Sequence, residues 1–456
     1  MPVLTPWYWQ SFPLGGRTGS QIFTQFFAQD RIATLLESPY PPSTDYPYLC
    51  RYSICAGKPR YHQGKPRLWT PPVGQIFPFL KALTPELSPE NHTSQRMTAD
   101  IPDHLPFQGG WLGWLGYDAA WEIERLPTLK ADVLPFPVAY WYEPENFAVL
   151  DHQEQILWLA SSSPAPPFPL SPSPPSPSSS SPSSLHFQTA QTDYEAMVLK
   201  AKNYIQKGDI FQANLSLRFT TETPQGSWQV YQTLQRINPS PFASYWRSPW
   251  GEVVSCSPER LVQLVGRQAQ TRPIAGTRPR GKSPREETQF GQDLRQNLKE
   301  QAEHIMLVDL ERNDLGRVCE WGSVKVNELL VLERYSHVMH LVSNVIGTLK
   351  PNYQAADLIQ ALFPGGTITG CPKVRCMEII EELEPVRRSL FYGSCGYLDH
   401  RGNLDLNILI RTLLFTQNQV IGQVGAGVVA DSNPHQEWLE SLQKAQAQLA
   451  ALNYSG

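Results

Sequence analysis

Long strand-like segments separated by few helices are the feature that most constrains the fold of this chain. Apolar runs rich in β-branched residues recur through its second half, among them LDLNILIRTLLF and QVIGQVGAGVVA. Helical patterns interrupt them most clearly at residues 192–208, 300–313, 372–383 and 435–452. A parallel sheet would need a helix after almost every strand. The pattern therefore predicts an α+β fold with large, mostly antiparallel sheets.

Two of these segments make local predictions that a structure can test. Thr192-Asp-Tyr-Glu195 has the spacing of a capping box, and Gly208 lies where a helix-ending glycine belongs. FQANLSLRF alternates apolar and polar side chains with a period of two. We therefore expect a helix that begins at Thr192, followed by a strand with one polar face.

Length, charge and cysteine content exclude several classes of protein. The chain has 456 residues, more than the ~250–300 at which a single core stops growing. Its formal net charge of −4 gives no basic field for nucleic acid or an anionic membrane. No apolar run approaches the ~18–20 residues of a membrane helix, and the N-terminus does not resemble a signal peptide. The seven cysteines are scattered without C-x-x-C, which predicts reduced thiols and a cytoplasmic location.

A Ser/Pro-rich segment divides the chain. In residues 161–184, 21 of 24 residues are Ser or Pro, a composition that cannot bury enough apolar surface to order itself. Strand-like sequences flank it on both sides, so we expect a disordered insertion in one compact unit. The predicted organisation is an N-terminal region at 1–160, the insertion at 161–184 and a C-terminal region at 185–456. A short Gly/Ser loop is expected to replace the insertion without loss of activity.

One motif points to nucleotide binding but lacks its context. Gly276 to Ser283 matches G-x-x-x-x-G-K-S, in which Lys282 would contact phosphates. However, the run before it is short and broken by proline, and the helix pattern after it is polar nearly throughout. We therefore expect no nucleotide site there.

Other residues suit a small anionic substrate, although each has a structural alternative. Glu303 and Glu440 lie on separate predicted helices and can hold one Mg²⁺ if substrate and water supply further oxygens. The alternative is two solvated helix faces. His340 lies in an apolar run, as an acid or base or as a core histidine. The glycine-rich turn with Thr367, and Arg411 at the end of the strand LNILIR, suit carboxylates or form a tight turn and a structural arginine.

Together these elements form an ordered series. SPER, RPIAGTRPRGK, AEHIMLVDLERNDLGRV, YSHVMHLVSNVIGTL, FPGGTITGCPKVRCMEIIEELEP, IRTL and GAGVVADS follow one another. The series resembles the chorismate-utilising enzymes, specifically component I of anthranilate and aminodeoxychorismate synthases. The resemblance is strong from Thr192 to the C-terminus and looser before the insertion. It implies two large antiparallel sheets in a sandwich with external helices, a component I-like N-terminal region and a chorismate-binding region at 185–456.

The resemblance also implies roles for individual residues. Glu303 and Glu440 correspond to Mg²⁺ ligands. The catalytic positions are Glu259, as general acid, with His340, Thr277 and Gln212. The substrate positions are Gly276, Thr367, Arg411, Gly425, Gly427 and Lys444. A tryptophan site is implied at Ser38, Pro241 and Phe242.

Gln212 indicates the type of reaction. Relatives that add water to chorismate have a lysine base at the corresponding place, because water is a poor nucleophile until it is deprotonated. Ammonia needs no such base, so Gln212 favours amination. None of the seven cysteines lies in a G-x-C-x-G elbow, and the ammonia is therefore expected from a separate glutamine amidotransferase.

Two sets of residues resemble different branches of the family. FPGGTITG, LPFQGGWLGWLGYD and the phenylalanine in NPSPFASYW resemble aminodeoxychorismate synthase, which leads to para-aminobenzoate and folate. In contrast, Ala275 stands where many such enzymes have a nucleophilic lysine, and PIAGT is the anthranilate form. We predict 4-amino-4-deoxychorismate, with anthranilate for tryptophan synthesis as the alternative. A silent subunit that only binds tryptophan would have no need of Glu259, Glu303, His340 and Glu440 together.

Overall fold

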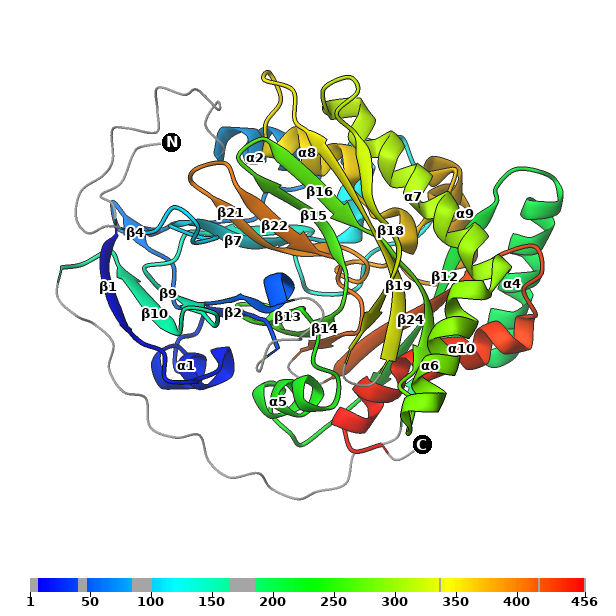
Figure 1. Cartoon of the computed structure of the whole chain (residues 1–456), viewed down its shortest axis with the longest axis horizontal. Coiled ribbons are helices and arrows are strands. Elements are labelled where there is room, and N and C mark those ends of the chain that lie inside the picture. The colour runs from blue at the N-terminus through cyan, green and yellow to red at the C-terminus, as the bar shows by residue number, and fades with distance from the viewer. Residues whose placement is uncertain are drawn as a thin grey trace.

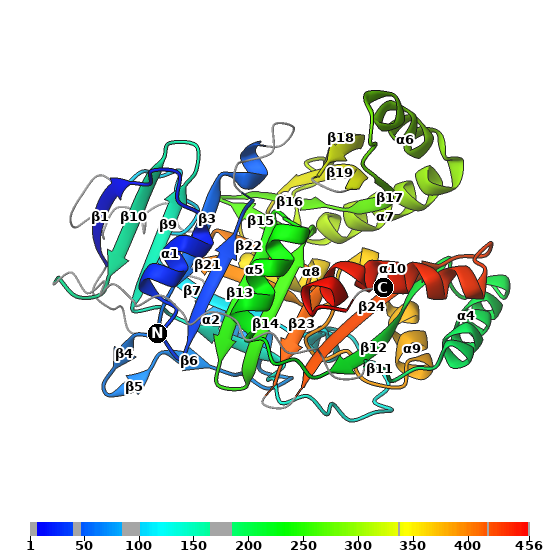
Figure 2. The same ribbon diagram turned by 90° about the horizontal axis from the view of Figure 1, so that it is seen from below.

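Two large antiparallel sheets, of 12 and 10 strands, form the body of the protein (Figure 1). The structure is a computed structural model that describes residues 7–39, 47–83, 101–164, 185–335, 338–416 and 419–454. Helices lie outside the sheets (Figures 1 and 2). The predicted α+β class is confirmed.

The 12-stranded sheet contains strands from both halves of the chain. Its order is β1 (Tyr8–Pro13), β10 (Ile156–Ser161), β9 (Asn146–Asp151), β3 (Tyr52–Ala56), β2 (Ala33–Glu37), β13 (Phe242–Ser248), β14 (Gly251–Ser257), β23 (Thr412–Phe415), β24 (Val420–Val428), β12 (Gln212–Thr221) and β11 (His186–Phe187), with β20 (Gly370–Cys371) also paired to β12.

The 10-stranded sheet also contains strands from both halves of the chain. Its order is β17 (Ile274–Pro279), β19 (Val338–Thr348), β16 (Gln268–Arg272), β15 (Arg260–Val265), β22 (Leu404–Asn407), β21 (Ser394–Asp399), β7 (Gly110–Leu115), β8 (Ala139–Tyr142) and β6 (Leu68–Trp69), with β18 (Lys325–Arg334) also paired to β19. A small hairpin pairs β4 (Tyr61–His62) with β5 (Lys65–Pro66).

The helices of the described residues are mostly amphipathic and short. They are α1 (Gly19–Phe26), α2 (Ile76–Leu83), α3 (Ala120–Ile123), α4 (Gln191–Gln206), α5 (Ser227–Ile237), α6 (Pro284–Gln296), α7 (Leu298–Val318), α8 (Ala355–Leu362), α9 (Lys373–Leu383) and α10 (Pro434–Ala451), with 3₁₀ turns η1 (Pro47–Cys50), η3 (Tyr117–Ala119) and η4 (Gly366–Ile368). Among the residues described, no helix has the length and apolarity needed to span a bilayer.

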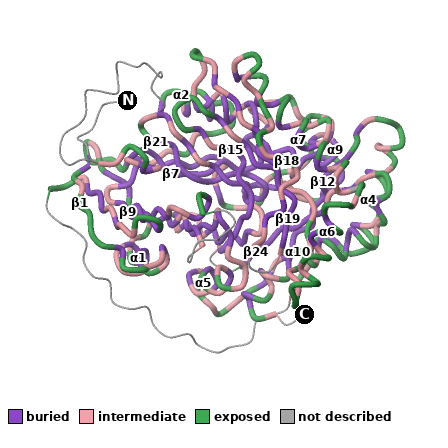
Figure 3. Tube along the Cα trace, viewed as in Figure 1, coloured by how far each residue is buried: buried purple, intermediate pink, exposed green. Residues whose placement is uncertain are grey.

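The core fills the space between the sheets and extends under the helices (Figure 3). Trp114 of β7 and Trp246 of β13 meet edge to face, with ring centroids 5.8 Å apart, and so join the two sheets. A second cluster packs helices against the 12-stranded sheet, with Phe23 of α1 against Tyr245 of β13. Large buried aromatic side chains of this kind dominate the energetics of a core.

One of the two local predictions, the start of the helix, is corrected, and the other, a strand with one polar face, is confirmed. Helix α4 begins at Gln191 with Ala190 as its N-cap, so Thr192 lies inside the first turn and forms no capping box. Gly208 does end it, with φ +81°. In β12 both faces are buried, including the polar face of Asn214 and Arg218. The polar side chains of this face are paired inside the protein: Arg218 Nε, for example, donates to Gln423 Oε1 at 3.1 Å.

The Ser/Pro-rich segment connects distant parts of the sheet. Strand β10 ends at Ser161 and lies next to one edge of the 12-stranded sheet, whereas β11 begins at His186 and forms the opposite edge (Figure 1). A short loop cannot join these ends, which corrects the expectation that one would replace the segment. Residues 165–184 lie outside the described residues, so the predicted disorder and domain boundaries stay predictions.

Candidate functional site

Carboxylates of the helix that follows the nucleotide-like motif accept hydrogen bonds from its backbone. The N–H groups of Gly281 and Lys282 donate to Glu287 Oε2 (2.7 Å) and Glu286 Oε2 (2.8 Å). Ser283 caps α6, and the strand before it, β17, is antiparallel to β19. The backbone donors that would bind a phosphate are thus already engaged. This geometry supports the prediction that no nucleotide binds there.

His340, Thr277 and Gly276 form one contact group at the end of the 10-stranded sheet. His340 of β19 is the register partner of Thr277 of β17. Gly276 has φ +67° and interrupts the register, and a Cβ there would lie 2.2 Å from Glu300 Oε2. Both the backbone conformation and the space require glycine at this position.

The protonation state of His340 follows from its hydrogen bonds. Its Nδ1 lies 3.1 Å from the carbonyl oxygen of Gly276 and 3.0 Å from Thr277 Oγ1. A carbonyl oxygen can only accept, so Nδ1 carries the proton and Nε2 has a lone pair. Burial, together with the positive charge of Arg411, lowers the pKa of His340 to about 3. The imidazole is therefore neutral at physiological pH.

Glu259 is a buried carboxyl that keeps its proton at neutral pH. It lies between β14 and β15, where its carbonyl oxygen accepts from the Ile408 N–H at 3.0 Å. Burial, with a smaller contribution from the nearby Glu311 carboxylate, raises the pKa of Glu259 to about 8. The Thr367 hydroxyl, the Ile274 N–H and the Arg411 guanidinium act in the opposite direction. A neutral carboxyl in such surroundings can serve as a general acid.

Arg411 lies between the sheets and not at the end of a strand. The apolar run LDLNILIRTLLF is two strands, β22 in the 10-stranded sheet and β23 in the 12-stranded sheet. Arg411 lies in the connection with φ +50°, and its Nη1 donates to Asn238 Oδ1 at 3.3 Å. Burial lowers the pKa of its guanidinium. Where the chain passes from one sheet to the other, the cation of Arg411 is thus close enough to act on both Glu259 and His340.

A second contact group comes from the 12-stranded sheet and α10. The sequence Gly425-Ala-Gly427 suggests a flexible turn, but both glycines lie within strand β24. A Cβ on Gly427 would lie 2.5 Å from the side-chain Nε2 of Gln212. Lys444 Nζ donates to the Gly425 carbonyl oxygen at 3.1 Å and pairs with Glu440 at 2.8 Å. These predicted positions are therefore neighbours.

The Thr367 turn connects the two groups. Asn214 of β12 pairs with Gly427 and its Nδ2 lies 3.4 Å from the carbonyl oxygen of Thr367. The Thr367 hydroxyl in turn lies near the Glu259 carboxyl and lowers its pKa. The residues predicted as catalytic and substrate-binding thus lie around the meeting point of β12 and β24 with β15, β17 and β19.

The predicted metal ligands lie on helices on the same side of the molecule. Glu303 is on α7, which packs on β17 and β19, and Glu440 is on α10, which packs on β24 (Figure 2). Both offer carboxylate oxygens, the donors that Mg²⁺ prefers. In the described residues, three metal-ligating side chains gather only at His104, Asp151 and Glu154. There Arg51 already binds both carboxylates, at 2.7 and 2.9 Å.

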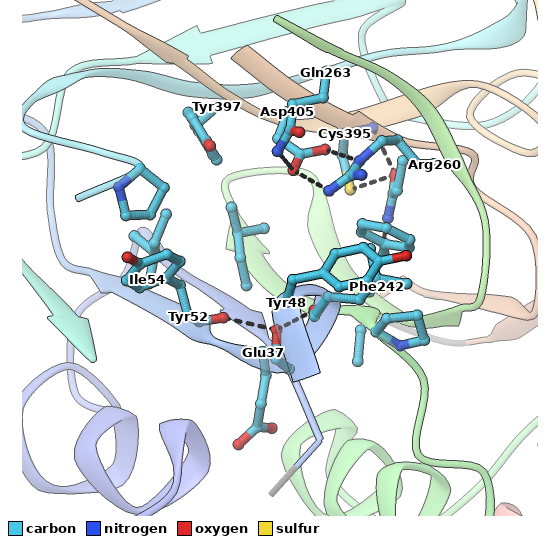
Figure 4. A pocket seen from close by; sticks show the side chains of 18 residues that line it. Glu37, Tyr48, Tyr52, Ile54, Phe242, Arg260, Gln263, Cys395, Tyr397 and Asp405 are labelled. Carbon is cyan, nitrogen blue, oxygen red and sulfur yellow. Dashed lines mark hydrogen bonds and ion pairs between the residues drawn. The ribbon is translucent and has the colours of Figure 1, made fainter. Parts of the chain in front are cut away.

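The residues predicted for tryptophan line a pocket whose wall includes Arg260, the residue directly after Glu259. Ser38, Pro241 and Phe242 share a cavity of about 120 Å³ (Figure 4). Arg260 makes two hydrogen bonds of 2.8 Å to Asp405 in its wall and stacks over Phe242. Tryptophan as its occupant stays a prediction.

Sequence reasoning missed several residues around the site. Glu300 precedes Glu303 by three residues on α7, and Glu437 precedes Glu440 by three on α10. This i, i+3 spacing was a detectable signal, because it places both carboxylates on one helix face. Asn214 and Glu311 gave no comparable signal, since their contacts are with residues distant in the chain.

Comparisons with known proteins agree with this geometry. The family described as chorismate binding enzyme matches residues 74–450. The chain is 67% identical to an "Anthranilate synthase component I-like protein" of Synechocystis sp., covering 98% of this chain and 92% of that protein. It is 46% identical to "Aminodeoxychorismate synthase component 1" of Bacillus subtilis, over 78% and 79% of the two chains.

A solved structure shows the same fold. Anthranilate synthase component I from Streptococcus pneumoniae superposes with a TM-score of 0.71 and 30% identity, covering 88% of this chain and 92% of that one. The matched family segment includes every residue predicted as catalytic, substrate-binding or metal-ligating. The chain belongs to the chorismate binding enzyme family.

Proposed function

We propose that this protein aminates chorismate with Mg²⁺ as its cofactor and forms 4-amino-4-deoxychorismate. The observation that carries the proposal is the Glu259 carboxyl, buried near Arg411 and Thr367 with a pKa of about 8. Such a group is protonated at neutral pH and can give its proton to the departing ring hydroxyl. Membership of the family supplies the substrate class.

The surrounding residues suit the other demands of this reaction. Arg411 and Lys444 are cations that can bind the two carboxylates of chorismate. The His340 Nε2 lone pair can accept a hydrogen bond from the substrate. The neutral Gln212 amide offers no base to activate water, so ammonia is the fitting nucleophile.

Glu303 and Glu440 would hold the metal. When bound, Mg²⁺ supplies positive charge that neutralises the ring carboxylate. Glu440 is paired with Lys444, but both side chains are about half exposed (51% and 43%). An exposed ion pair of this kind contributes only about 0–1 kcal/mol, so Lys444 can readily exchange it for a substrate carboxylate.

Ammonia is proposed to come from a separate glutamine amidotransferase subunit. The relatives include component I proteins named for both branches. The FPGGTITG sequence and the Bacillus subtilis relative support 4-amino-4-deoxychorismate, whereas Ala275 favours anthranilate, the second candidate product.

Product analysis tests the proposal. The purified chain is incubated with chorismate, ammonium and Mg²⁺, with and without the lyase that converts 4-amino-4-deoxychorismate to para-aminobenzoate. We expect lyase-dependent para-aminobenzoate and no consumption of chorismate in EDTA. Anthranilate as the sole product would overturn the branch, and unchanged chorismate would overturn the function.

A further inference from the structure

Glu311 of helix α7 is a buried carboxyl close to the Thr367 turn. Glu311 is 4% exposed and lies eight residues beyond Glu303. Its carboxylate accepts a hydrogen bond from the Gly366 N–H, and a Cβ on Gly366 would lie 3.5 Å from its Oε1. The contact ties α7 to the residue directly before Thr367.

A strand of the 10-stranded sheet holds the other oxygen of the same carboxyl. The Thr271 hydroxyl of β16 lies 3.2 Å from Glu311 Oε2 and 2.8 Å from the Leu261 carbonyl oxygen. Glu311 therefore bridges β16 and the η4 turn. The metal-ligand helix, the sheet and the Thr367 turn meet at this one side chain.

Two other hydrogen bonds of the turn come from strand β12 and from the segment after α9. Arg388 Nη1 donates to the Ile368 carbonyl oxygen at 2.7 Å, and Asn214 approaches the Thr367 carbonyl oxygen at 3.4 Å. These donors hold carbonyl oxygens, whereas Glu311 holds an N–H. Loss of Glu311 would therefore release the turn on the side that faces α7.

Few charged groups face the carboxyls of Glu259 and Glu311. Facing Glu259 are Glu311 from α7, Arg411 from the connection between the sheets, and the Thr367 hydroxyl and Ile274 N–H. Facing Glu311 are Asp314 on its own helix and Lys373 of α9. Lys373 Nζ is already bonded to Asp314 (2.5 Å) and to the Leu362 carbonyl oxygen (2.9 Å). Glu311 is therefore the acidic group that faces Glu259 from α7.

We propose that Glu311 is a positioning residue for the Glu259 acid, holding the Thr367 turn and placing an acidic group behind Glu259. The inference rests in part on the proposed function. Two neighbouring buried carboxyls cannot both ionise without repulsion, so the second proton leaves at higher pH than it would from a lone carboxyl. Burial itself also raises the pKa of Glu311. The pair would keep Glu259 protonated over a wider pH range.

Two variants separate charge from shape. Glu311→Gln keeps the shape and an acceptor for the Gly366 N–H but removes the charge. The descending limb of the pH profile of kcat/KM should move down by about 0.5 pH unit or more. Glu311→Asp keeps the charge but shortens the reach, so kcat should fall about tenfold with little movement of the limb. Asp309→Asn, an exposed site on the same helix, should change neither.

A coincident pH profile for Glu311→Gln and the wild type would overturn the inference, whatever happens to Tm. A second readout does not depend on activity. A carboxyl whose pKa is raised by folding makes the folded protein less stable as pH rises through that pKa. Glu311→Gln should therefore lose less Tm between pH 6 and 9 than the wild type, and this gain should shrink in a Glu259→Gln background. An equal gain in both backgrounds would show independent sites. This measurement decides the coupling even if chorismate is not consumed and the proposed function fails.

Discussion

The imidazole Nδ1 of His340 lies 3.1 Å from the carbonyl oxygen of Gly276. This single contact assigns the proton to Nδ1 and leaves Nε2 as an acceptor. Because the contact crosses from β19 to β17 at a left-handed glycine, it depends on strand pairing between residues 64 positions apart. The predicted catalytic histidine is thus oriented by a backbone carbonyl and not by a carboxylate.

The pH dependence of activity should have a basic limb only. Glu259 must be protonated to act as an acid, and its pKa is raised to about 8, so kcat/KM should fall as pH rises through about 8. His340, with a pKa near 3, stays neutral and should add no inflection near pH 6.5. The profile is measured at constant free ammonia, since protonation of the nucleophile would distort it. An ascending limb centred near 6.5 would contradict the assignment.

Removal of either proposed Mg²⁺ ligand should abolish activity while the fold survives. Glu303→Ala and Glu440→Ala change partly or largely exposed helix positions, so unfolding free energy should change by only about 0.5 kcal/mol. Turnover is assayed over a Mg²⁺ titration, with Asp309→Ala and Gln443→Ala as matched controls on α7 and α10. Near-full turnover of a Glu variant at saturating Mg²⁺ would exclude that ligand.

The length of the Ser/Pro-rich connection should matter more than its sequence. From β10 to β11 there are nine strand spacings in the sheet order, or about 43 Å at ~4.8 Å each. About 13 extended residues are needed to cover this distance. Replacing 165–184 by twenty Gly/Ser residues should preserve solubility and activity, whereas a four-residue linker should give an insoluble or swapped product. A soluble, active monomer with the short linker would contradict the observed topology.

Two glycines of β24 should respond differently to alanine. At Gly427 the new Cβ meets the end of the flexible Gln212 side chain at 2.5 Å, so Tm should hardly change while kcat falls about tenfold. At Gly425 it meets the Leu215 carbonyl oxygen at 2.3 Å, and a backbone clash should lower Tm by several degrees. Circular dichroism melts and initial rates check both. Equal Tm values for the two variants would refute this distinction.

Ala275 should influence which product forms. A lysine at this position could add covalently to the ring and direct ammonia to the carbon that bore the hydroxyl. With alanine, we expect slow formation of 4-amino-4-deoxychorismate with detectable anthranilate. Ala275→Lys should raise the ratio of the first product to the second, and Ala275→Met, similar in length without the amine, is the control. If the wild type makes anthranilate alone at ~1–10 s⁻¹, the alternative product is the correct one.

Predictions from sequence succeeded where the signal lies in neighbouring residues. The strand pattern of β19, the helix pattern of α7 and α10 and the Glu440–Lys444 pair one turn apart all follow from local periodicity, and the structure contains them. Arg411 was identified as a residue near the site but placed wrongly at a strand end. Its run is uniformly apolar, so periodicity cannot show where the chain leaves one sheet for the other.

What the sequence alone determined is the fold class, the family through its ordered motifs and the chemical types of the site residues. Only the tertiary structure decided their surroundings. Burial raises the proton affinity of Glu259 and lowers that of His340, and Glu311 reaches the Thr367 turn across 55 residues of sequence. The physical reason is that desolvation and charge–charge interaction depend on distances in space. Those distances are set by how the two sheets meet, and no local pattern along the chain records them.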